Sequence, residues 1–254
     1  MVFFRKLAWL GVVLLALASG LPGARAGETT VAVAASFAGV MADLAREFEA
    51  AEGHHVVVVV GSSGKLASQI MHGAPIDILL SADEERPAAL VARGLAAPED
   101  RFTYAIGRLA LWSADARLLS GGGEAWLKQT GAGRLALANP KLAPYGTAAL
   151  ETLKALGIDA AMAPRLVYGE NVGQAFALAR SGAAEAAFVA WSQALTPEGI
   201  RGSSWLVPQS LHRPLRQDGV LVARSKGNSA ARAFIAFLGS MRARSVIDRA
   251  GFGG

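Results

Sequence analysis

Along residues 29–93, short apolar runs alternate with segments in which apolar residues recur every three or four positions. The runs predict strands and the segments predict helices. Apolar runs at 29–34, 56–60 and 77–80 are short and bounded by small or polar residues, as is typical of buried strands. Residues 37–52 instead place apolar side chains three and four positions apart, which indicates an amphipathic helix that ends at Gly53. Helices at 63–71 and 84–93 follow in the same manner.

The pattern repeats in the second half of the chain. Strands are predicted at 109–112, 134–138, 165–168 and 186–189, and helices at 147–156 and 172–180. Continuous apolar strands separated by helices are typical of a parallel sheet that helices cover on both faces. Two such runs predict an α/β fold of two lobes, each a mainly parallel sheet flanked by helices.

The last part of the chain defines the expected lobe boundaries. Residues 205–222 are predicted to be extended, with a turn at 216–219, and residues 229–250 to form a closing helix that packs on the first lobe. A chain that crosses twice between two lobes makes a hinge. We therefore predict lobe I at 27–106 plus 210–254 and lobe II at 107–209.

The first 26 residues have the pattern of a signal peptide. Arg5 and Lys6 precede an apolar run at 7–21, and Ala24 and Ala26 provide the small residues of a cleavage site. The apolar run is too short to span a bilayer, and no later segment has about 18 uninterrupted apolar residues. We expect export to the periplasm, cleavage near Gly27, and no membrane insertion afterwards.

Charge and composition exclude several classes of protein. The formal charge of +5 falls to +2 without the three basic residues of the predicted signal peptide, and the remaining basic residues are scattered among acids, so we expect no nucleic-acid partner. The sequence has no cysteine, which excludes disulfides, thiolate metal sites and cysteine nucleophiles. The four histidines lack the spacing of a metal site; they are His54, His55, His72 and His212.

Three junctions between a strand and a helix carry small or hydroxylic residues. They are 35–36, 61–64 and 170–172, and the loop at 139–147 leads into a helix in a similar way. The first turn of a helix leaves backbone N–H groups without partners and carries partial positive charge, so it binds an anion without lysine or arginine. Serine is also a preferred N-cap, so the alternative at each of the three junctions is a residue that only caps its own helix. At 139–147 the alternative is an ordinary proline-containing turn.

Ser62 and Lys65 match the S-x-x-K motif of exported penicillin-recognising serine acyl-enzymes. The companion Ser-Asp-Asn and Lys-Thr-Gly elements are absent from the sequence, and this enzyme stays an alternative. Asp77, Asp83 and Glu170 are the acids to be considered for a binding site. Carboxylates repel a bound anion, so we interpret these three as hinge or helix-capping groups.

Five ordered blocks of the sequence resemble the periplasmic molybdate-binding proteins of ABC importers, and the resemblance extends over residues 28–252. The blocks are 30–37, 61–70, 73–83, 134–140 and 170–172. The resemblance implies a two-lobed periplasmic-binding-protein fold that buries a tetrahedral oxyanion in the cleft between its lobes. It implies a receptor for molybdate and tungstate, without catalytic activity or cofactor, that delivers the ion to a membrane permease. We expect this receptor to be a monomer.

Carried over by position, the resemblance assigns the oxyanion to uncharged donors. Ser36 and Ser63 would donate hydroxyl and backbone N–H groups from lobe I, and Tyr145 and Val172 would donate backbone N–H groups from lobe II. Molybdenum would be present only as the oxyanion, with no protein ligand to the metal. Charge-assisted hydrogen bonds of about 1.5–3 kcal/mol each, together with helix dipoles, stabilise a dianion in such a cleft.

One position departs from the family. Some members contact the anion with a tyrosine hydroxyl from the strand near residues 188–191, where this sequence has Ala190. Its neighbour Trp191 is a candidate fifth contact through its indole N–H, and the alternative is a tryptophan of the wall or core. A receptor for sulfate or phosphate also stays open as an alternative, because the sequence does not reveal the size of the cleft.

Overall fold

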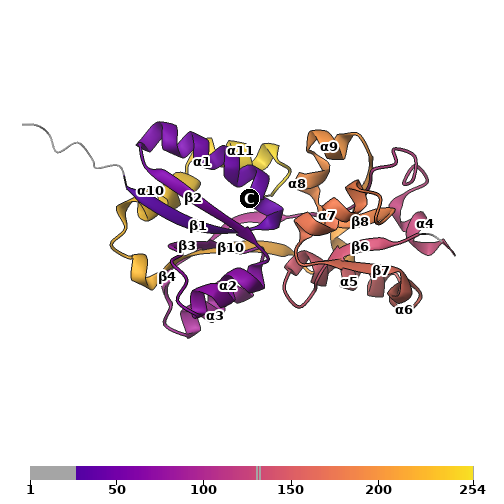
Figure 1. The fold of residues 1–254 in the computed structure, drawn as a ribbon, viewed down its shortest axis with the longest axis horizontal. Coiled ribbons are helices and arrows are strands. Elements are labelled where there is room, and N and C mark those ends of the chain that lie inside the picture. Colours follow the sequence, from indigo (N-terminus) through magenta and orange to yellow (C-terminus); the bar gives the residue numbers. More distant parts are fainter. Residues whose placement is uncertain (1–26, 130, 132, 254) are drawn as a thin grey trace, which may run out of the picture.

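The computed structural model describes residues 27–129, 131 and 133–253. The predicted signal peptide at 1–26 lies outside these residues. Two five-stranded sheets lie side by side along the long axis of the molecule, and helices flank both (Figure 1). The two-lobed α/β fold that the sequence predicts is confirmed.

The first sheet has the strand order β2-β1-β3-β10-β4. Strands β1, β2 and β3 are parallel, whereas β10 runs antiparallel to both β3 and β4. The three parallel strands correspond to the strands that the apolar runs of the sequence predict. The bounds are β1 (Glu28–Ala34), β2 (His55–Gly61), β3 (Ile78–Leu80), β4 (Ala96–Gly107) and β10 (Leu215–Val222).

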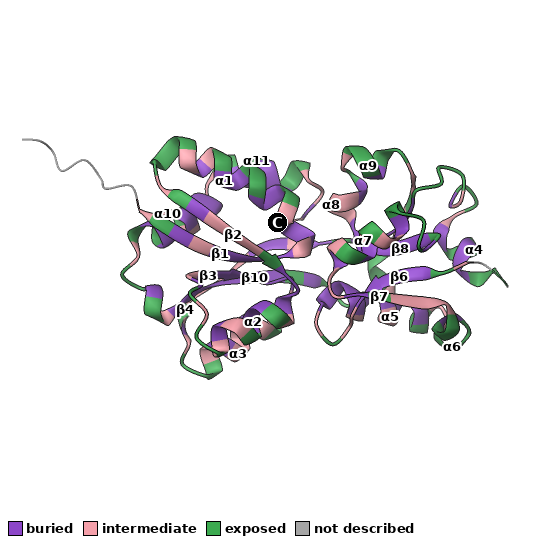
Figure 2. Cartoon of the chain, viewed as in Figure 1, coloured by how far each residue is buried: buried purple, intermediate pink, exposed green. Residues whose placement is uncertain are grey.

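Alternate residues of β1 enter two different cores, because successive side chains of a strand point to opposite faces. Val31 and Val33 belong to one apolar cluster and Ala32 to another. Residues 31–34 of this strand are all buried, so both faces need apolar side chains there (Figure 2). The first face carries η1 (Ala35–Phe37), α1 (Ala38–Glu52), α10 (Ser229–Leu238) and α11 (Met241–Arg249), and the second carries α2 (Ser63–Met71) and α3 (Glu85–Ala92). The short η4 (Ala223–Ser225) follows β10.

The second sheet has the order β7-β6-β8-β5-β9, in which β6, β7 and β8 are parallel and β5 is antiparallel to β8 and β9. Its strands are β5 (Leu109–Ser113), β6 (Leu135–Ala138), β7 (Leu166–Gly169), β8 (Ala186–Ala190) and β9 (Ser203–Leu206). Its helices are α4 (Gly123–Lys128), α5 (Pro144–Ala155), α6 (Asp159–Met162), η2 (Ala163–Arg165), α7 (Val172–Arg180), α8 (Trp191–Ala194), α9 (Pro197–Ile200) and η3 (Gln209–Leu211). Across the described residues, the helices are all too short or too polar to cross a bilayer.

The chain crosses between the two sheets twice. β4 ends at Gly107 and β5 begins at Leu109, and the return runs from Leu206 at the end of β9 to Leu215 at the start of β10. Two crossings allow the lobes to move as rigid bodies about a hinge. The predicted lobe boundaries after residues 106 and 209 stay a prediction.

Two expectations for the last part of the chain are wrong. Residues 216–219 form no turn, because they lie within β10 and pair there with neighbouring strands. The closing helix is two helices, since α10 ends before Gly239 and the Ser240 side chain caps α11 by accepting a hydrogen bond from the Ala243 N–H at 3.2 Å. The sequence pattern also does not predict the long strand β4.

Replacing Phe48 of α1 tests the core of lobe I. Its side chain is fully buried and lies edge to face against Phe234 of α10, with the ring centroids 5.1 Å apart. Phe48→Ala leaves a cavity, so we expect the free energy of unfolding in a urea titration to fall by about 3–5 kcal/mol. Met241→Ala, at an exposed position, should change it by less than about 0.5 kcal/mol. Equal losses in the two variants would contradict this packing.

Candidate functional site

A small cavity lies where the carboxyl ends of parallel strands from both sheets face each other. Its volume of about 10 Å³ is close to the space that one water molecule needs. Open α/β sheets bind ligands at such strand ends. The residues that line it are all uncharged: Ala34, Ala35, Ser36, Gly61, Ser62, Ser63 and Ala82 from one side, and Ala143, Pro144, Tyr145, Asn171 and Val172 from the other.

Lobe I brings three serine hydroxyls to this cavity. Ser36 and Ser62 are buried, and among the described residues the Oγ atom of each makes no hydrogen bond of regular geometry, although the Ser36 side chain lies close enough to the Tyr145 hydroxyl to oppose the rise of its pKa. Ser63 Oγ accepts a hydrogen bond from the Ala82 N–H at 2.9 Å, which leaves the hydroxyl proton of Ser63 free to be donated. A buried polar group without a partner costs about 1–3 kcal/mol, so these hydroxyls favour a bound acceptor.

Ser62 is a site residue that the sequence prediction lacks. It stands at the N-cap position of α2, yet its side chain makes no capping hydrogen bond, and none is made at the start of η1 or α1. Asn171 does cap α7, because its side chain accepts a hydrogen bond from the Gln174 N–H at 3.1 Å. The capping interpretation therefore holds for Asn171 and fails for Ser62. The run of two serines at 62–63 is the signal that could have identified it.

Lobe II contributes backbone N–H groups from the first turns of two helices. Tyr145 is the second residue of α5 and Val172 is the first residue of α7, so neither N–H has an acceptor four residues earlier within its helix. No other backbone acceptor for these two groups lies in the part of the chain that the structure describes. The structure thus brings the four predicted residues Ser36, Ser63, Tyr145 and Val172 to one cavity.

Ala190 and Trp191 do not line this cavity. The Ala190 N–H donates to Gln193 Oε1 at 3.0 Å, and the Trp191 N–H donates to the Arg108 carbonyl at 2.8 Å, so both backbone donors are already used. The Trp191 ring lies beside Gly251, near the end of the chain. The structure therefore does not place either residue as the fifth contact.

Ser62 and Lys65 do not have the arrangement of an acyl-enzyme. Lys65 Nζ lies 3.0 Å from Glu170 Oε2 and 3.2 Å from Glu170 Oε1. An acyl-enzyme serine needs a base within hydrogen-bond reach, and Ser62 Oγ has no partner among the described residues. The charge of Lys65 is instead paired at the surface beside the cavity.

Direct contacts join the two lobes around this site. The Gly64 N–H in α2 donates to the Leu142 carbonyl before α5 at 2.9 Å, and Ser192 Oγ in α8 donates to the Ser36 carbonyl in η1 at 2.9 Å. The Lys65 ion pair with Glu170 is a third contact of this kind. Each of them requires the lobes to lie close together, so the structure is a closed form of the molecule.

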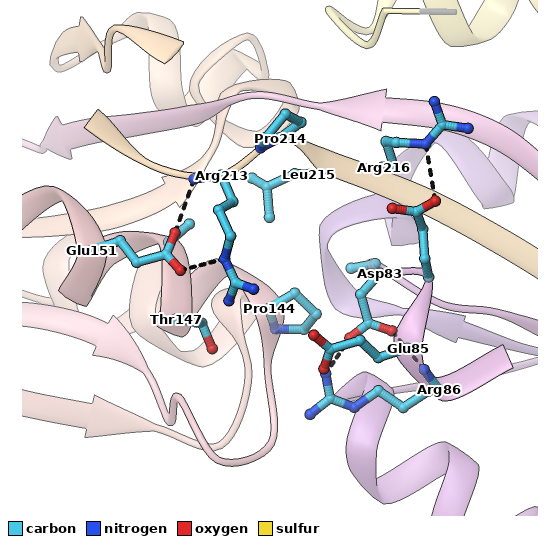
Figure 3. Close-up of a pocket in the computed structure, with 13 residues that line it drawn as sticks. Asp83, Glu85, Arg86, Pro144, Thr147, Glu151, Arg213, Pro214, Leu215 and Arg216 are labelled. Carbon is cyan, nitrogen blue, oxygen red and sulfur yellow. Dashed lines mark hydrogen bonds and ion pairs between the residues drawn. The ribbon is translucent and has the colours of Figure 1, made fainter. Parts of the chain in front are cut away.

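A larger cavity of about 270 Å³ lies between α5, the residues around the start of α3 and the connection into β10 (Figure 3). Carboxylates line it, and its arginines are paired with them; Arg213 Nε, for example, lies 2.7 Å from Glu151 Oε1. Carboxylates repel an anion, so this cavity does not suit an oxyanion despite its size. The other ion pairs here are Arg86 with Asp83 and Arg216 with Glu84.

The two candidate aspartates lie outside the small cavity. Asp77 accepts hydrogen bonds from the Thr30 N–H at 2.7 Å and from Ser225 Oγ at 2.5 Å. Asp83 accepts a hydrogen bond from the Arg86 N–H at 3.1 Å, at the start of α3. Both carboxylates thus hold backbone segments in place. Among the described residues, no cluster of three histidine or acidic side chains could hold a metal ion.

Comparison with known proteins agrees with this geometry. The family of bacterial extracellular solute-binding proteins matches residues 29–253. The molybdate-binding protein ModA of Rhodobacter capsulatus is 42% identical over 243 residues, 95% of each chain, and ModA of Azotobacter vinelandii is 41% identical over 98% of this chain and 97% of its own. The solved periplasmic molybdate-binding protein of Azotobacter vinelandii has a TM-score of 0.83 at 37% identity, over 88% of this chain and 98% of its own. This chain belongs to the bacterial extracellular solute-binding proteins, in the group of the ModA proteins.

Lys65→Met tests whether the ion pair favours the closed form. Both side chains are partly exposed, so the pair contributes at most about 1 kcal/mol, and its loss should shift the lobes toward an open form by up to about fivefold. The sequence has no cysteine, so dyes introduced by Glu52→Cys and Lys154→Cys report the interlobe distance by single-molecule energy transfer. Lys128→Met, which breaks a similarly exposed pair with Glu124 within lobe II, should leave the distances unchanged. Unchanged interlobe distances in Lys65→Met would contradict a role of this ion pair in closure.

Proposed function

We propose that this protein is a periplasmic receptor that binds molybdate or tungstate between its lobes and delivers the ion to the membrane permease of an ABC importer. One observation carries the proposal. Serine hydroxyls of lobe I and backbone N–H groups of lobe II converge on a small cavity with no charged side chain in its lining. The relatives named as molybdate-binding proteins support this choice of ligand.

Neutral donors suit a doubly charged tetrahedral ion. The oxygens of such an ion accept hydrogen bonds and donate none, so a site built from donors satisfies them. Each charge-assisted hydrogen bond contributes about 1.5–3 kcal/mol, and the first turns of α2, α5 and α7 add the partial positive charge of their helix dipoles. Binding of this kind needs no cofactor and no covalent step, and the proposal includes no catalytic activity.

The residues that line the cavity also favour molybdate over phosphate as the ligand. Phosphate carries a proton near neutral pH and is best held by a site that includes a carboxylate acceptor. Among the residues that the structure describes, no carboxylate lines this cavity. Sulfate has the same charge as molybdate and a smaller radius, so a direct comparison of affinities separates these two ligands.

The proposal also covers the cellular localisation of the protein and its partners. The signal peptide predicted at 1–26 and the relative named as periplasmic support export to the periplasm. We expect a monomer whose lobes close on the ion and whose closed form docks on the permease. Neither nucleic acid nor the membrane itself is a partner in this scheme.

Calorimetric titration of the mature protein with four anions tests the proposed function. We expect molybdate and tungstate to bind with similar affinity, because they share shape and charge, and sulfate and phosphate to bind more weakly. Molybdate should also raise the melting temperature, since a ligand that binds the folded state stabilises it. The proposal would be overturned if molybdate gave no binding heat and no rise in melting temperature. Tighter binding of sulfate than of molybdate would reassign the ligand.

Substitution of the cavity serines tests the donors of lobe I. Ser36→Ala, Ser62→Ala and Ser63→Ala each remove one hydroxyl from the lining, and each should weaken molybdate binding by about 1–3 kcal/mol in the same calorimetric titration. Ser68→Ala, at an exposed position of α2, is the matched control and should leave the affinity unchanged. If all three cavity variants bind as tightly as this control, the hydroxyls do not contact the ion.

A further inference from the structure

A hydrogen bond between buried side chains joins the two lobes next to the hinge. Gln217 of β10 is fully buried, and its Nε2 donates to the hydroxyl of Tyr145 in α5 at 3.1 Å. Its Oε1 accepts a hydrogen bond from the hydroxyl of Tyr104 in β4 at 2.9 Å. Gln217 and Tyr104 belong to the first sheet, whereas Tyr145 belongs to the helix that leads out of β6 in the second. The amide therefore connects two tyrosines that lie in different lobes.

The space around this contact is closely packed. Gly107 lies where the chain leaves β4 for the second lobe, and a Cβ atom at this position would overlap the Tyr145 hydroxyl and lie 2.5 Å from Gln217 Nε2. Tyr145 is only 2% exposed, and burial raises the pKa of its hydroxyl well above the ordinary value. The hydroxyl thus stays neutral, and only a glycine at position 107 leaves room for it.

Tyr145 contributes to the site in two separate ways. Its backbone N–H lies in the first turn of α5 and is one of the proposed anion donors. Its side chain ties the same turn of helix to a strand of the opposite lobe. A donor that is already held in its bound position loses less freedom when the ligand binds, and this preorganisation increases affinity.

We propose that Gln217 and the Tyr145 hydroxyl form a positioning pair, which holds the start of α5 against lobe I in the closed form and thereby slows release of the bound anion. The inference rests on the proposed function, because it concerns the same anion site. It also goes beyond that function, since the donor assigned there is the Tyr145 N–H, which any residue at this position except proline would supply.

Two substitutions test the pair without removing that N–H. Tyr145→Phe deletes only the hydroxyl, and Gln217→Met deletes the amide with little change in volume. We expect each variant to release molybdate about 2- to 10-fold faster than the wild type in stopped-flow measurements, with little change in the association rate. The double variant should release it no faster than the more affected single variant, because both changes remove the same hydrogen bond.

Tyr104→Phe is the matched control. It removes a hydroxyl bonded to the same amide, but both groups lie in lobe I, so it should lower the melting temperature and leave the release rate unchanged. In the doubly labelled protein without anion, Tyr145→Phe and Gln217→Met should shift the interlobe distances toward the open form, and Tyr104→Phe should not. A purely structural role would change stability in all three variants and would not separate them by rate or distance.

The outcomes separate this inference from the proposed function. Release at the wild-type rate in both Tyr145→Phe and Gln217→Met, or additive effects in the double variant, would overturn the positioning pair and leave the anion receptor intact. If the wild type binds none of the four anions, the proposed function fails. In that case the interlobe distances of the same variants still decide whether the pair holds the lobes together.

Discussion

Buried hydrogen-bond donors without a protein acceptor are the constraint on which this molecule depends. More than nine-tenths of buried polar groups in folded proteins are paired, because an unpaired one costs about 1–3 kcal/mol. Here the parallel strands end at one place, and the helices that follow them point the N–H groups of their first turns there. Ser36 and Ser62 add buried hydroxyls at the same point, and neither Oγ atom is paired within the part of the chain that the structure describes. An anion that accepts from these donors, as in the proposed function, would remove this cost.

The apolar pattern predicts the strands that are buried on both faces and fails where a strand lies among polar partners. β10 contains Asp218 and Gly219, which are typical of a turn. In the structure Asp218 is paired with Arg101 at 2.6 Å and with Thr103 at 2.8 Å, both in β4. The side chain of Phe102 fills the space where Gly219 lacks a Cβ. These partners are more than a hundred residues away in sequence, so local preference predicts a turn although the sheet stabilises a strand.

For the candidate site as well, the sequence predicts the features that depend on neighbouring residues and misses those that depend on residues far away in the chain. The start of a helix supplies free N–H groups whatever its sequence, so the strand-to-helix junctions could be identified before the fold was known. Whether each serine hydroxyl is hydrogen-bonded could not be predicted, because its partner would come from another helix or strand. Ser63 Oγ is an acceptor for the Ala82 N–H, whereas the Oγ atom of its neighbour Ser62 has no partner among residues 27–129, 131 and 133–253. The pairing of Gln217 with Tyr145 depends on closure of the lobes, for which a linear sequence has no signal.

The described residues that line the cavity include no cation, so under the proposed function the ions would be distinguished by size and not by charge. Molybdate, tungstate and sulfate carry the same charge, so a lysine or arginine in the cavity would attract them all and would have to be desolvated on closure. Lys65 lies in the first turn of α2, but its charge is paired with Glu170 outside the cavity. What remains to distinguish the ions is the distance between donors of the two lobes. The backbone hydrogen bond between Gly64 and Leu142 involves no flexible side chain, and the Tyr145 hydroxyl lies against Gly107 and Gln217, so these contacts restrict how closely the lobes approach. Under the proposed function, the size of the preferred anion would thus depend on the contacts between the lobes as well as on the donors themselves.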